Sequence, residues 1–403
     1  MQRPSERTII LLVGAVQFVN ILDFMIVMPL GPDFGRALQI PNAMLGYVGG
    51  GYTAAAALAG IGTALFLERF DRRSALAVAM FGLVVGTLAG SFATGLRSLV
   101  AARVVAGMFG GPATSLAFSI IADTIPPERR GKAMGAVMGA FSVASILGVP
   151  AGLELARVGG WRLPFIAVAA LGVVIAGGAV FLLPPMRGHL RGGRPPIGLE
   201  PLLRLVRQPL VLTSYTMTAM VMMAGFMLLP NFSAYIQSNL HYPRIQLGRL
   251  YLIGGLVSFF SLRLVGFLVD RYGSFRVGTL GAVLLLTVTY LFLIGYQPGY
   301  SVPLLFTSFM VAMSFRNVSY NTLASKVPSP RERASFMSLQ SAVQHAASSL
   351  GAFFGARMLT ELPDGSLVGL GGVARYSMTL TALLPALLFV VERRVRRRAA
   401  TAA

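Results

Sequence analysis

One acidic residue differs from all the others in its surroundings. Of the 14 acidic residues, Asp23 alone lies deep within a long apolar stretch. A charge at bilayer depth costs about 2.5–3.5 kcal/mol on insertion scales, so this side chain must be paired, protonated or in contact with water. A buried carboxyl that gains and loses a proton could couple a membrane process to protons. The alternative is a structural ion pair that holds its helix against a neighbour.

The partner that best matches Asp23 in depth is Arg103. At 1.5 Å per residue, Asp23 lies ~4–5 Å from the middle of its apolar stretch, and Arg103 lies ~10 Å from the middle of its own. Both displacements point toward the same membrane face, and the difference of ~6 Å is within the reach of an arginine side chain. We therefore predict an Asp23–Arg103 pair that protonation of the carboxylate breaks.

A polar stripe leads up to Asp23. Gln17, Asn20 and Asp23 are spaced i, i+3, i+6, which places them on one face of a helix. Polar stripes inside membrane helices usually face a bundle interior or a wet cavity. Hydrogen bonds that hold helices together are an equally good explanation for Gln17.

The second half of the chain offers a different set of polar side chains. Arg316 lies within ~3 Å of the middle of its apolar stretch, and no acidic residue of that half lies at a comparable depth. The partner of its guanidinium must therefore be backbone carbonyls, Asp23, or an anionic group of a substrate. Its polar neighbours along the sequence and in the following stretch are predicted to line a substrate cavity: Asn317, Tyr320, Asn321, Gln340 and Gln344. His345 is either packed through a hydrogen bond or a second proton-coupling residue, because histidine changes charge between pH 5 and 8.

Twelve apolar stretches must position these residues. A helix that crosses ~30 Å of hydrocarbon needs about 20 mostly apolar residues, and such runs occupy 8–31, 43–67, 74–95, 98–122, 132–156, 162–183, 209–239, 246–268, 277–296, 302–325, 334–357 and 374–391. The composition agrees, with 55% hydrophobic and 12% charged residues where a soluble domain has about 25% charged residues. We predict an all-α integral membrane protein and exclude soluble, disordered and fibrous classes.

The basic residues indicate the orientation. The net charge is +20, from 34 basic and 14 acidic residues. If the N-terminus is inside, 23 basic residues lie on the cytoplasmic side, 8 on the other side and 3 within spans. This bias predicts cytoplasmic termini and removes a nucleic-acid partner, because no basic face belongs to a soluble domain. The first stretch is too long for a signal peptide, so we expect a retained span.

An internal repeat divides the chain. The loop at 67–73 resembles the loop at 269–276, with Glu68 opposite Asp270 at an offset of 202, and Pro127 is opposite Pro330 at an offset of 203. We predict a six-helix bundle over 1–183, a cytoplasmic linker over 184–208, and a second bundle with a basic tail over 209–403. Such six-plus-six repeats place a substrate site at the membrane midplane between the halves.

Four patterns in the expected spans carry a family resemblance. The second half has Gly266-x-x-x-Asp270-Arg271-x-Gly273, while the first half departs from this pattern at Ala64, Glu68 and Asp71 but keeps Arg69, Arg72 and Arg73. The other patterns are Arg103-x-x-x-Gly107, Gly148-x-Pro150-x-Gly152, and the run from Leu22 to Pro29 around Asp23. The chain resembles major facilitator superfamily transporters, in particular the twelve-span drug:proton antiporters and the arabinose-efflux-permease-like bacterial group.

The resemblance implies a multi-pass monomer in a bacterial inner membrane that carries a small-molecule substrate and has gates near the membrane surfaces. On the cytoplasmic side, Glu68 would cap the start of the span at 334–357, and Arg72 or Arg73 would pair with Asp123. Arg69 would belong to the same gate. Asp270 and Arg271 would act near Lys132 in the fifth span. Gly148, Pro150 and Gly152 would form a kinked, tightly packed contact between the halves.

Enzymatic motifs are absent from the sequence. It contains no phosphate-binding Gly-x-x-x-x-Gly-Lys-Ser/Thr loop, no His-Glu-x-x-His and no Gly-x-Ser-x-Gly. There is no cysteine for a disulfide or a thiolate metal site. We predict a secondary active transporter, not an enzyme, with no cofactor or metal and with a proton gradient as its energy source. It would export small organic or amphipathic compounds by alternating access. The alternative is a facilitator or proton symporter for a polar solute such as a sugar or an organic anion.

Overall fold

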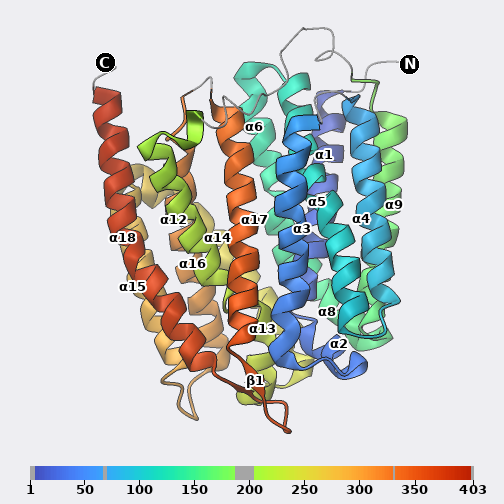
Figure 1. Cartoon of the computed structure of the whole chain (residues 1–403), viewed down its shortest axis with the longest axis vertical. Coiled ribbons are helices and arrows are strands. Elements are labelled where there is room, and N and C mark those ends of the chain that lie inside the picture. Colours follow the sequence, from blue (N-terminus) through green and yellow to red (C-terminus); the bar gives the residue numbers. More distant parts are fainter. Residues whose placement is uncertain (1–4, 67–69, 187–203, 330–331, 401–403) are drawn as a thin grey trace. The chain divides into compact units, whose positions relative to one another are not determined.

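The computed structural model describes residues 5–66, 70–186, 204–329 and 332–400, with the side chains of 63–66, 127–128, 333–334 and 399–400 left out. Helices account for most of these residues (Figure 1), and ten helical segments are long and apolar enough to cross a membrane. The predicted all-α membrane fold is confirmed. The remaining two predicted spans coincide with α16 (Val302–Ser325) and α17 (Arg333–Arg357), which are long enough to cross but carry more polar residues.

The chain divides into two compact units. Unit 1 comprises Met1–Pro41 and Tyr47–Gly198, and unit 2 comprises Asn42–Gly46 and Leu199–Ala403. The helices of the first half are α1 (Glu6–Val27), α2 (Gly31–Leu38), α3 (Leu45–Phe66), α4 (Arg72–Ser91), α5 (Leu96–Thr124), α6 (Pro127–Met138), α7 (Ala140–Val143), α8 (Val149–Gly159) and α9 (Arg162–Leu182). A 3₁₀ turn, η1 (Asn42–Met44), precedes α3, and a π-helical turn, η3 (Ala144–Gly148), joins α7 to α8.

The second half continues with the same kinds of element. Its helices are α12 (Pro209–Phe226), α13 (Leu229–Ala234), α14 (Arg244–Tyr272), α15 (Ser274–Leu293), α16, α17 and α18 (Leu370–Ala400), with a π-helical turn, η4 (Tyr235–Asn239), after α13. A small antiparallel hairpin of β1 (Thr360–Glu361) and β2 (Leu367–Val368) precedes α18, with Thr360 opposite Val368. The apolar periodicity gave no sign of this hairpin, because each strand has only two residues.

Local signals explain where helices begin and bend. Ser5 caps α1 by accepting a hydrogen bond from the Thr8 amide, as N-terminal serines commonly do. The predicted span 132–156 is divided into α6, α7, η3 and α8. Pro150 is the second residue of α8. A proline lacks the N–H that would continue the hydrogen-bond ladder from the preceding turn, so the backbone adjusts locally.

The two units repeat one packing pattern. In unit 1, α4 packs against α5 and α9, and α1 packs against the same two helices. In unit 2, α15 packs against α16 and α18, and α12 packs against that pair. The neighbours therefore correspond in chain order, as the repeat in the sequence predicts.

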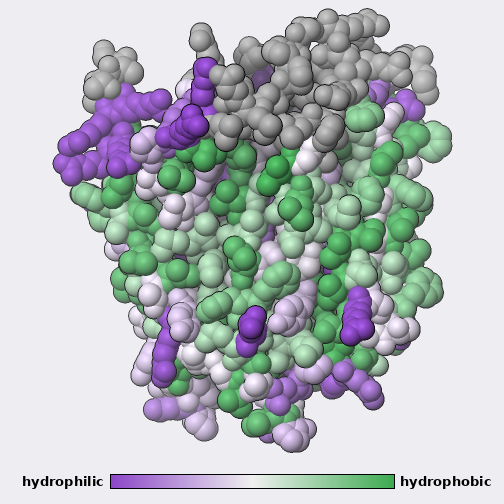
Figure 2. Space-filling model, in the orientation of Figure 1, coloured by the Kyte–Doolittle hydropathy of each residue, from purple (hydrophilic) through white to green (hydrophobic). Residues whose placement is uncertain are grey.

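The outer surface of the helices is apolar. Large hydrophobic side chains such as Leu58, Phe81 and Phe181 are more than two-thirds exposed. Figure 2 shows apolar side chains over the middle of the helices and hydrophilic ones near their ends, including the basic end of α18. This distribution suits helices whose sides contact lipid and whose ends contact water.

A buried ion pair as candidate coupling site

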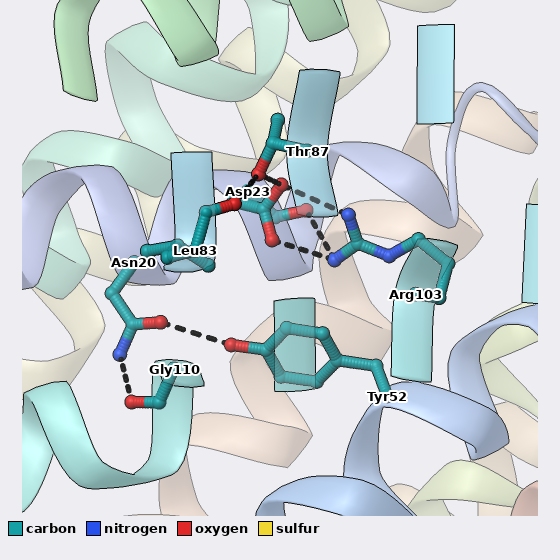
Figure 3. Close-up of polar contacts among 7 residues, drawn as sticks. All are labelled: Asn20, Asp23, Tyr52, Leu83, Thr87, Arg103 and Gly110. Atoms are coloured by element: carbon teal, nitrogen blue, oxygen red, sulfur yellow. Dashed lines mark hydrogen bonds and ion pairs between the residues drawn. The ribbon is translucent and has the colours of Figure 1, made fainter. Parts of the chain in front are cut away.

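Unit 1 encloses the ion pair predicted from the sequence. Arg103 of α5 donates from Nη1 to Oδ1 of Asp23 at 2.9 Å and from Nη2 to Oδ2 at 2.6 Å, and both side chains are 1% exposed (Figure 3). Nη2 also donates to the Asp23 backbone carbonyl at 3.3 Å. Both residues lie about 10 Å from the middles of their helices at 1.5 Å per residue. Equal depth explains why the guanidinium meets the carboxylate with two hydrogen bonds.

A threonine completes the surroundings of the carboxylate. The Thr87 hydroxyl of α4 lies 2.7 Å from Asp23 Oδ1 and 2.8 Å from the backbone carbonyl of Leu83 (Figure 3). A hydroxyl has one hydrogen and two acceptor lone pairs. It can donate to the ionised carboxylate, or donate to Leu83 while it accepts a hydrogen bond from the protonated carboxyl. The site therefore has a hydrogen-bond partner for either protonation state of Asp23.

A tyrosine connects the ion pair to the polar stripe of α1. The Tyr52 ring of α3 lies 4.9 Å from the Arg103 guanidinium carbon, and its hydroxyl donates to Asn20 Oδ1 at 2.9 Å. The Asn20 amide in turn donates to the Gly110 carbonyl at 2.9 Å and to Thr114 Oγ1 at 2.6 Å. Asn20 thus joins α1, α3 and α5 within unit 1 rather than lining an open surface. The Gln17 side chain is also buried, and its Oε1 has no hydrogen-bond partner among the described residues.

Glycines of α5 permit this close arrangement. A methyl group on Gly107 would overlap the Tyr52 backbone, and one on Gly110 would overlap the Tyr52 hydroxyl and lie 2.7 Å from Asn20 Oδ1. The Arg103-x-x-x-Gly107 pattern therefore combines the charge with the space for α3.

The glycines of the fifth span pack within unit 1. A methyl on Gly148 would lie 2.7 Å from Leu22 Cδ1, and one on Gly152 would overlap Ile26. Both neighbours belong to α1 and flank Asp23, so these glycines support the helix that carries the carboxylate. A contact between the halves was expected for these glycines, but the neighbours found here lie in α1 of the same unit. The spacing of glycines in a sequence predicts that another helix comes close, but it does not say which helix.

Only some of the polar residues predicted for the second half are joined by hydrogen bonds. Arg316 and Tyr320 of α16 are 2% and 1% exposed, and Gln344 of α17 donates to the Tyr320 hydroxyl at 3.2 Å. Arg316 Nε donates to the side chain of its neighbour Asn317 at 3.3 Å. The other predicted members differ in burial: Gln340 is buried and its Oε1 has no hydrogen-bond partner in the part of the chain that the structure describes, whereas Asn321 is exposed. His345 Nδ1 lies 2.8 Å from the Ser341 carbonyl of its own helix.

The predicted cytoplasmic gate is partly described. Arg72 Nε lies 3.3 Å from Asp123 Oδ2, so Arg72 rather than Arg73 makes this contact. Asp71, where the first-half loop departs from the family pattern, caps α4 by accepting from the amides of Arg73 and Ser74. Glu68 and Arg69 lie outside the described residues.

At the matching loop of unit 2, the acidic residue that accepts a hydrogen bond from the start of the next helix is not part of the loop. Asp270 and Arg271 are exposed at the end of α14, and Gly273 follows with a φ of 89°, a conformation that favours glycine. Glu392 of α18 accepts a hydrogen bond from the Phe275 amide at 2.5 Å in the first turn of α15. A carboxylate at a helix N-terminus is favourable because it faces unpaired amides.

Sequence reasoning missed Tyr52 and Thr87. Tyr52 had a detectable signal, since it is a large polar side chain within a run of glycine and alanine, from Gly49 to Ala57. Thr87 had none, because a single hydroxyl in an apolar helix usually bonds its own helix backbone.

Curated relatives of the chain are transporters. It is 29% identical to the inner membrane transport protein YdhP of Escherichia coli K12 over 222 residues, which are 55% of each chain, so the match spans about half of that relative. It is 25% identical to the chloramphenicol resistance protein of Streptomyces lividans over 68% of this chain and 70% of that protein. It is 26% identical to the purine ribonucleoside efflux pump NepI of Shigella dysenteriae over 79% of this chain and 78% of that protein.

Solved structures share the fold at low identity. A bacterial homologue of the human lysosomal transporter Spinster, inward-facing and unoccupied, matches with a TM-score of 0.75 and 17% identity over 98% of both chains. The nucleoside transporter NupG matches with a TM-score of 0.71 and 14% identity over 95% of this chain and 99% of that one. The model of the Major Facilitator Superfamily matches residues 13–352. The chain therefore belongs to the Major Facilitator Superfamily, and the family and the relatives named above are membrane transporters, not enzymes.

Proposed function

We propose that this transporter exports small organic or amphipathic compounds in exchange for protons, with Asp23 as the proton-coupling residue. The observation that carries the proposal is the bidentate Asp23–Arg103 pair, in which both side chains are 1% exposed. A charge pair so far from water is stable only while both charges are present. Protonation of Asp23 therefore changes the packing of α1 against α5 more than protonation of an exposed acid would.

The coupling step follows from this electrostatics. A proton on Asp23 removes the negative charge and leaves Arg103 as an uncompensated buried cation, which destabilises the paired arrangement. Thr87 accepts the new O–H and keeps the neutral carboxyl hydrogen-bonded. The Arg103 guanidinium can then donate hydrogen bonds to other acceptors as the bundle changes conformation. In alternating access, this change would accompany the opening of the substrate site to the opposite side of the membrane.

Names of the relatives suggest substrates to test first. One confers chloramphenicol resistance and another is a purine ribonucleoside efflux pump. Both names fit export of small organic molecules from the cytoplasm. The basic loops further support cytoplasmic termini in a bacterial inner membrane, and we propose that one chain forms the functional unit.

The test is proton-driven transport in proteoliposomes. Wild-type protein is reconstituted with an internal pH dye, and chloramphenicol or inosine is added with and without an imposed pH gradient. We expect substrate movement to drive protons in the opposite direction. Asp23→Asn should abolish this proton movement while substrate exchange without a gradient survives. Wild-type proton movement by Asp23→Asn would refute the proposal.

A matched control comes from an exposed pair of the same unit. Glu154 and Arg157 lie 2.6 Å apart, with side chains 56% and 45% exposed. Glu154→Gln removes an acid from an ion pair of the same length but leaves the buried site intact, so it should transport as the wild type does.

The second candidate function is a facilitator or proton symporter for a polar solute. It is favoured by the buried Arg316 and by the Gln344–Tyr320 hydrogen bond of unit 2. The same dye assay separates the candidates, because a symporter moves protons with the solute and a facilitator moves none.

A further inference from the structure

Arg103 and Arg316 are the two most deeply buried arginines among the described residues, and they differ in their partners. Arg103 is paired with a carboxylate, whereas the Arg316 side chain donates a hydrogen bond from Nε to the neutral side chain of Asn317. Among the described residues, the terminal nitrogens of Arg316 have no hydrogen-bond acceptor. The residue is 2% exposed and lies about 4 Å from the middle of α16 at 1.5 Å per residue.

No described acidic residue of unit 2 forms an ion pair with Arg316. The described acidic residues of this unit are Asp270, Glu332, Glu361, Asp364 and Glu392. An arginine keeps its charge under all physiological conditions, and an unpaired buried charge is strongly unfavourable. An anion supplied from outside the chain would remove this cost.

Gly225 lets the Arg316 guanidinium lie directly against the backbone of α12. A methyl group on Gly225 of α12 would lie 3.3 Å from Arg316 Nη2 and 3.9 Å from Nη1. On the other side, a methyl on Gly281 of α15 would lie 2.9 Å from the Arg316 amide nitrogen, so α15 packs tightly against this part of α16. The backbone of Arg316 therefore packs against α15, and its guanidinium packs against α12 at Gly225.

An apolar side chain and an aromatic side chain of α16 lie next to Arg316 along the helix. The Met313 methyl lies 3.9 Å from the position of a Gly225 methyl, and the Tyr320 ring follows Arg316 by one helical turn. A ligand held here would place its charge on Arg316 and its apolar part against these side chains. A planar carboxylate matches the fork of a guanidinium with two hydrogen bonds.

We propose that Arg316 forms an anion-binding subsite in unit 2, which takes the carboxylate of a small amphipathic substrate. This inference rests on the proposed transport function and adds the chemical class of its substrate. The subsite belongs to one unit only, and Gly225 sets the position of the guanidinium against α12.

Equilibrium binding to the full-length protein tests the subsite. The protein is placed in nanodiscs of phosphatidylcholine, which has no net charge, and titrated with 4-phenylbutyrate and with its neutral amide. We expect the carboxylate to bind at least tenfold more tightly than the amide. Arg316→Gln should reduce carboxylate binding to the level of the amide, whereas the exposed Arg375→Gln should leave it unchanged. Equal binding of the two probes to the wild type, or undiminished carboxylate binding by Arg316→Gln, would overturn the proposal.

A second variant keeps the test decisive if Arg316→Gln does not fold. Gly225→Ala retains the guanidinium but places a methyl group 3.3 Å from Nη2, which must then shift. Carboxylate binding should therefore weaken several-fold while amide binding changes less. Unchanged carboxylate affinity in Gly225→Ala would contradict the role of this guanidinium position in binding. Replacement of the nanodisc lipid by phosphatidylglycerol should not compete with the probe. Competition would assign the anion to a lipid headgroup and overturn the substrate assignment.

The binding assay also separates this inference from the coupling proposal. Asp23→Asn should bind 4-phenylbutyrate as tightly as the wild type, because Asp23 lies in unit 1. If Asp23→Asn still moves protons, the coupling proposal fails and the Arg316 subsite stands. If Arg316→Gln binds the carboxylate normally while Asp23→Asn loses proton movement, the subsite fails and the coupling proposal stands.

Discussion

The Asp23–Arg103 pair leads to a quantitative prediction about stability. Asp23→Asn leaves the Arg103 guanidinium 1% exposed without its carboxylate. Removal of one partner from a buried pair typically costs about 3–5 kcal/mol, because the other charge stays buried and unpaired.

A double-mutant cycle isolates the interaction between these two side chains. The double variant Asp23→Asn with Arg103→Gln carries neither charge, so it should lose less stability than the two single variants together. We expect an interaction free energy of roughly 2–3 kcal/mol, at the upper end for residues in direct contact. The measurement is the free energy of unfolding in mixed micelles with increasing dodecyl sulfate.

The exposed pair Glu154–Arg157 provides the control cycle. Its closest N–O distance is 2.6 Å, the same as that of the buried pair, but its side chains are about half exposed. Water screens this interaction, so the cycle of Glu154→Gln and Arg157→Gln should give a much smaller interaction free energy. An interaction below about 0.5 kcal/mol for Asp23 and Arg103, the usual error of additivity for distant sites, would refute the reasoning.

Two further predictions concern single hydrogen bonds. Thr87→Val removes one hydrogen bond to the buried carboxylate and should lower the free energy of unfolding by about 1.5–3 kcal/mol, the range for bonds to charged groups. Thr87→Ser keeps the hydroxyl and should lose less, so equal losses in the dodecyl sulfate titration would contradict this role. At the N-terminus of α17, Ser329 and Gln208 donate hydrogen bonds that hold the pKa of Glu332 below its usual range. A lowered pKa contributes stability above the unfolded-state pKa and loses it as the pH falls through the folded-state value. Unfolding midpoints should therefore show Glu332→Gln to be less stable than the wild type at pH 7 and equal to it in acid, and a difference that persists in acid would argue against this contribution.

Much of the fold was predictable because the membrane imposes length and polarity on each helix. The apolar stretch at 98–122 became α5 (Leu96–Thr124) and the stretch at 277–296 became α15 (Ser274–Leu293), within a few residues. A kink was expected at Gly148–Gly152 in the span at 132–156, but the division of this span into α6, α7, η3 and α8 was not predicted, and neither was the hairpin before α18. Hydropathy averages over about 20 residues and does not register a single turn.

The ion pair is the part of the site that the sequence itself determined. Asp23 and Arg103 are charged residues within apolar stretches at similar depths, and two opposite charges in a low dielectric must find each other or remain unfavourable. Side chains without a charge carry no such requirement. The tertiary structure alone placed Tyr52 over the guanidinium and Thr87 beside the carboxylate. It also placed Gly148 and Gly152 against α1 and left Arg316 without an acid among the described residues. These contacts depend on which helix faces meet, and only the packing of the whole bundle decides that.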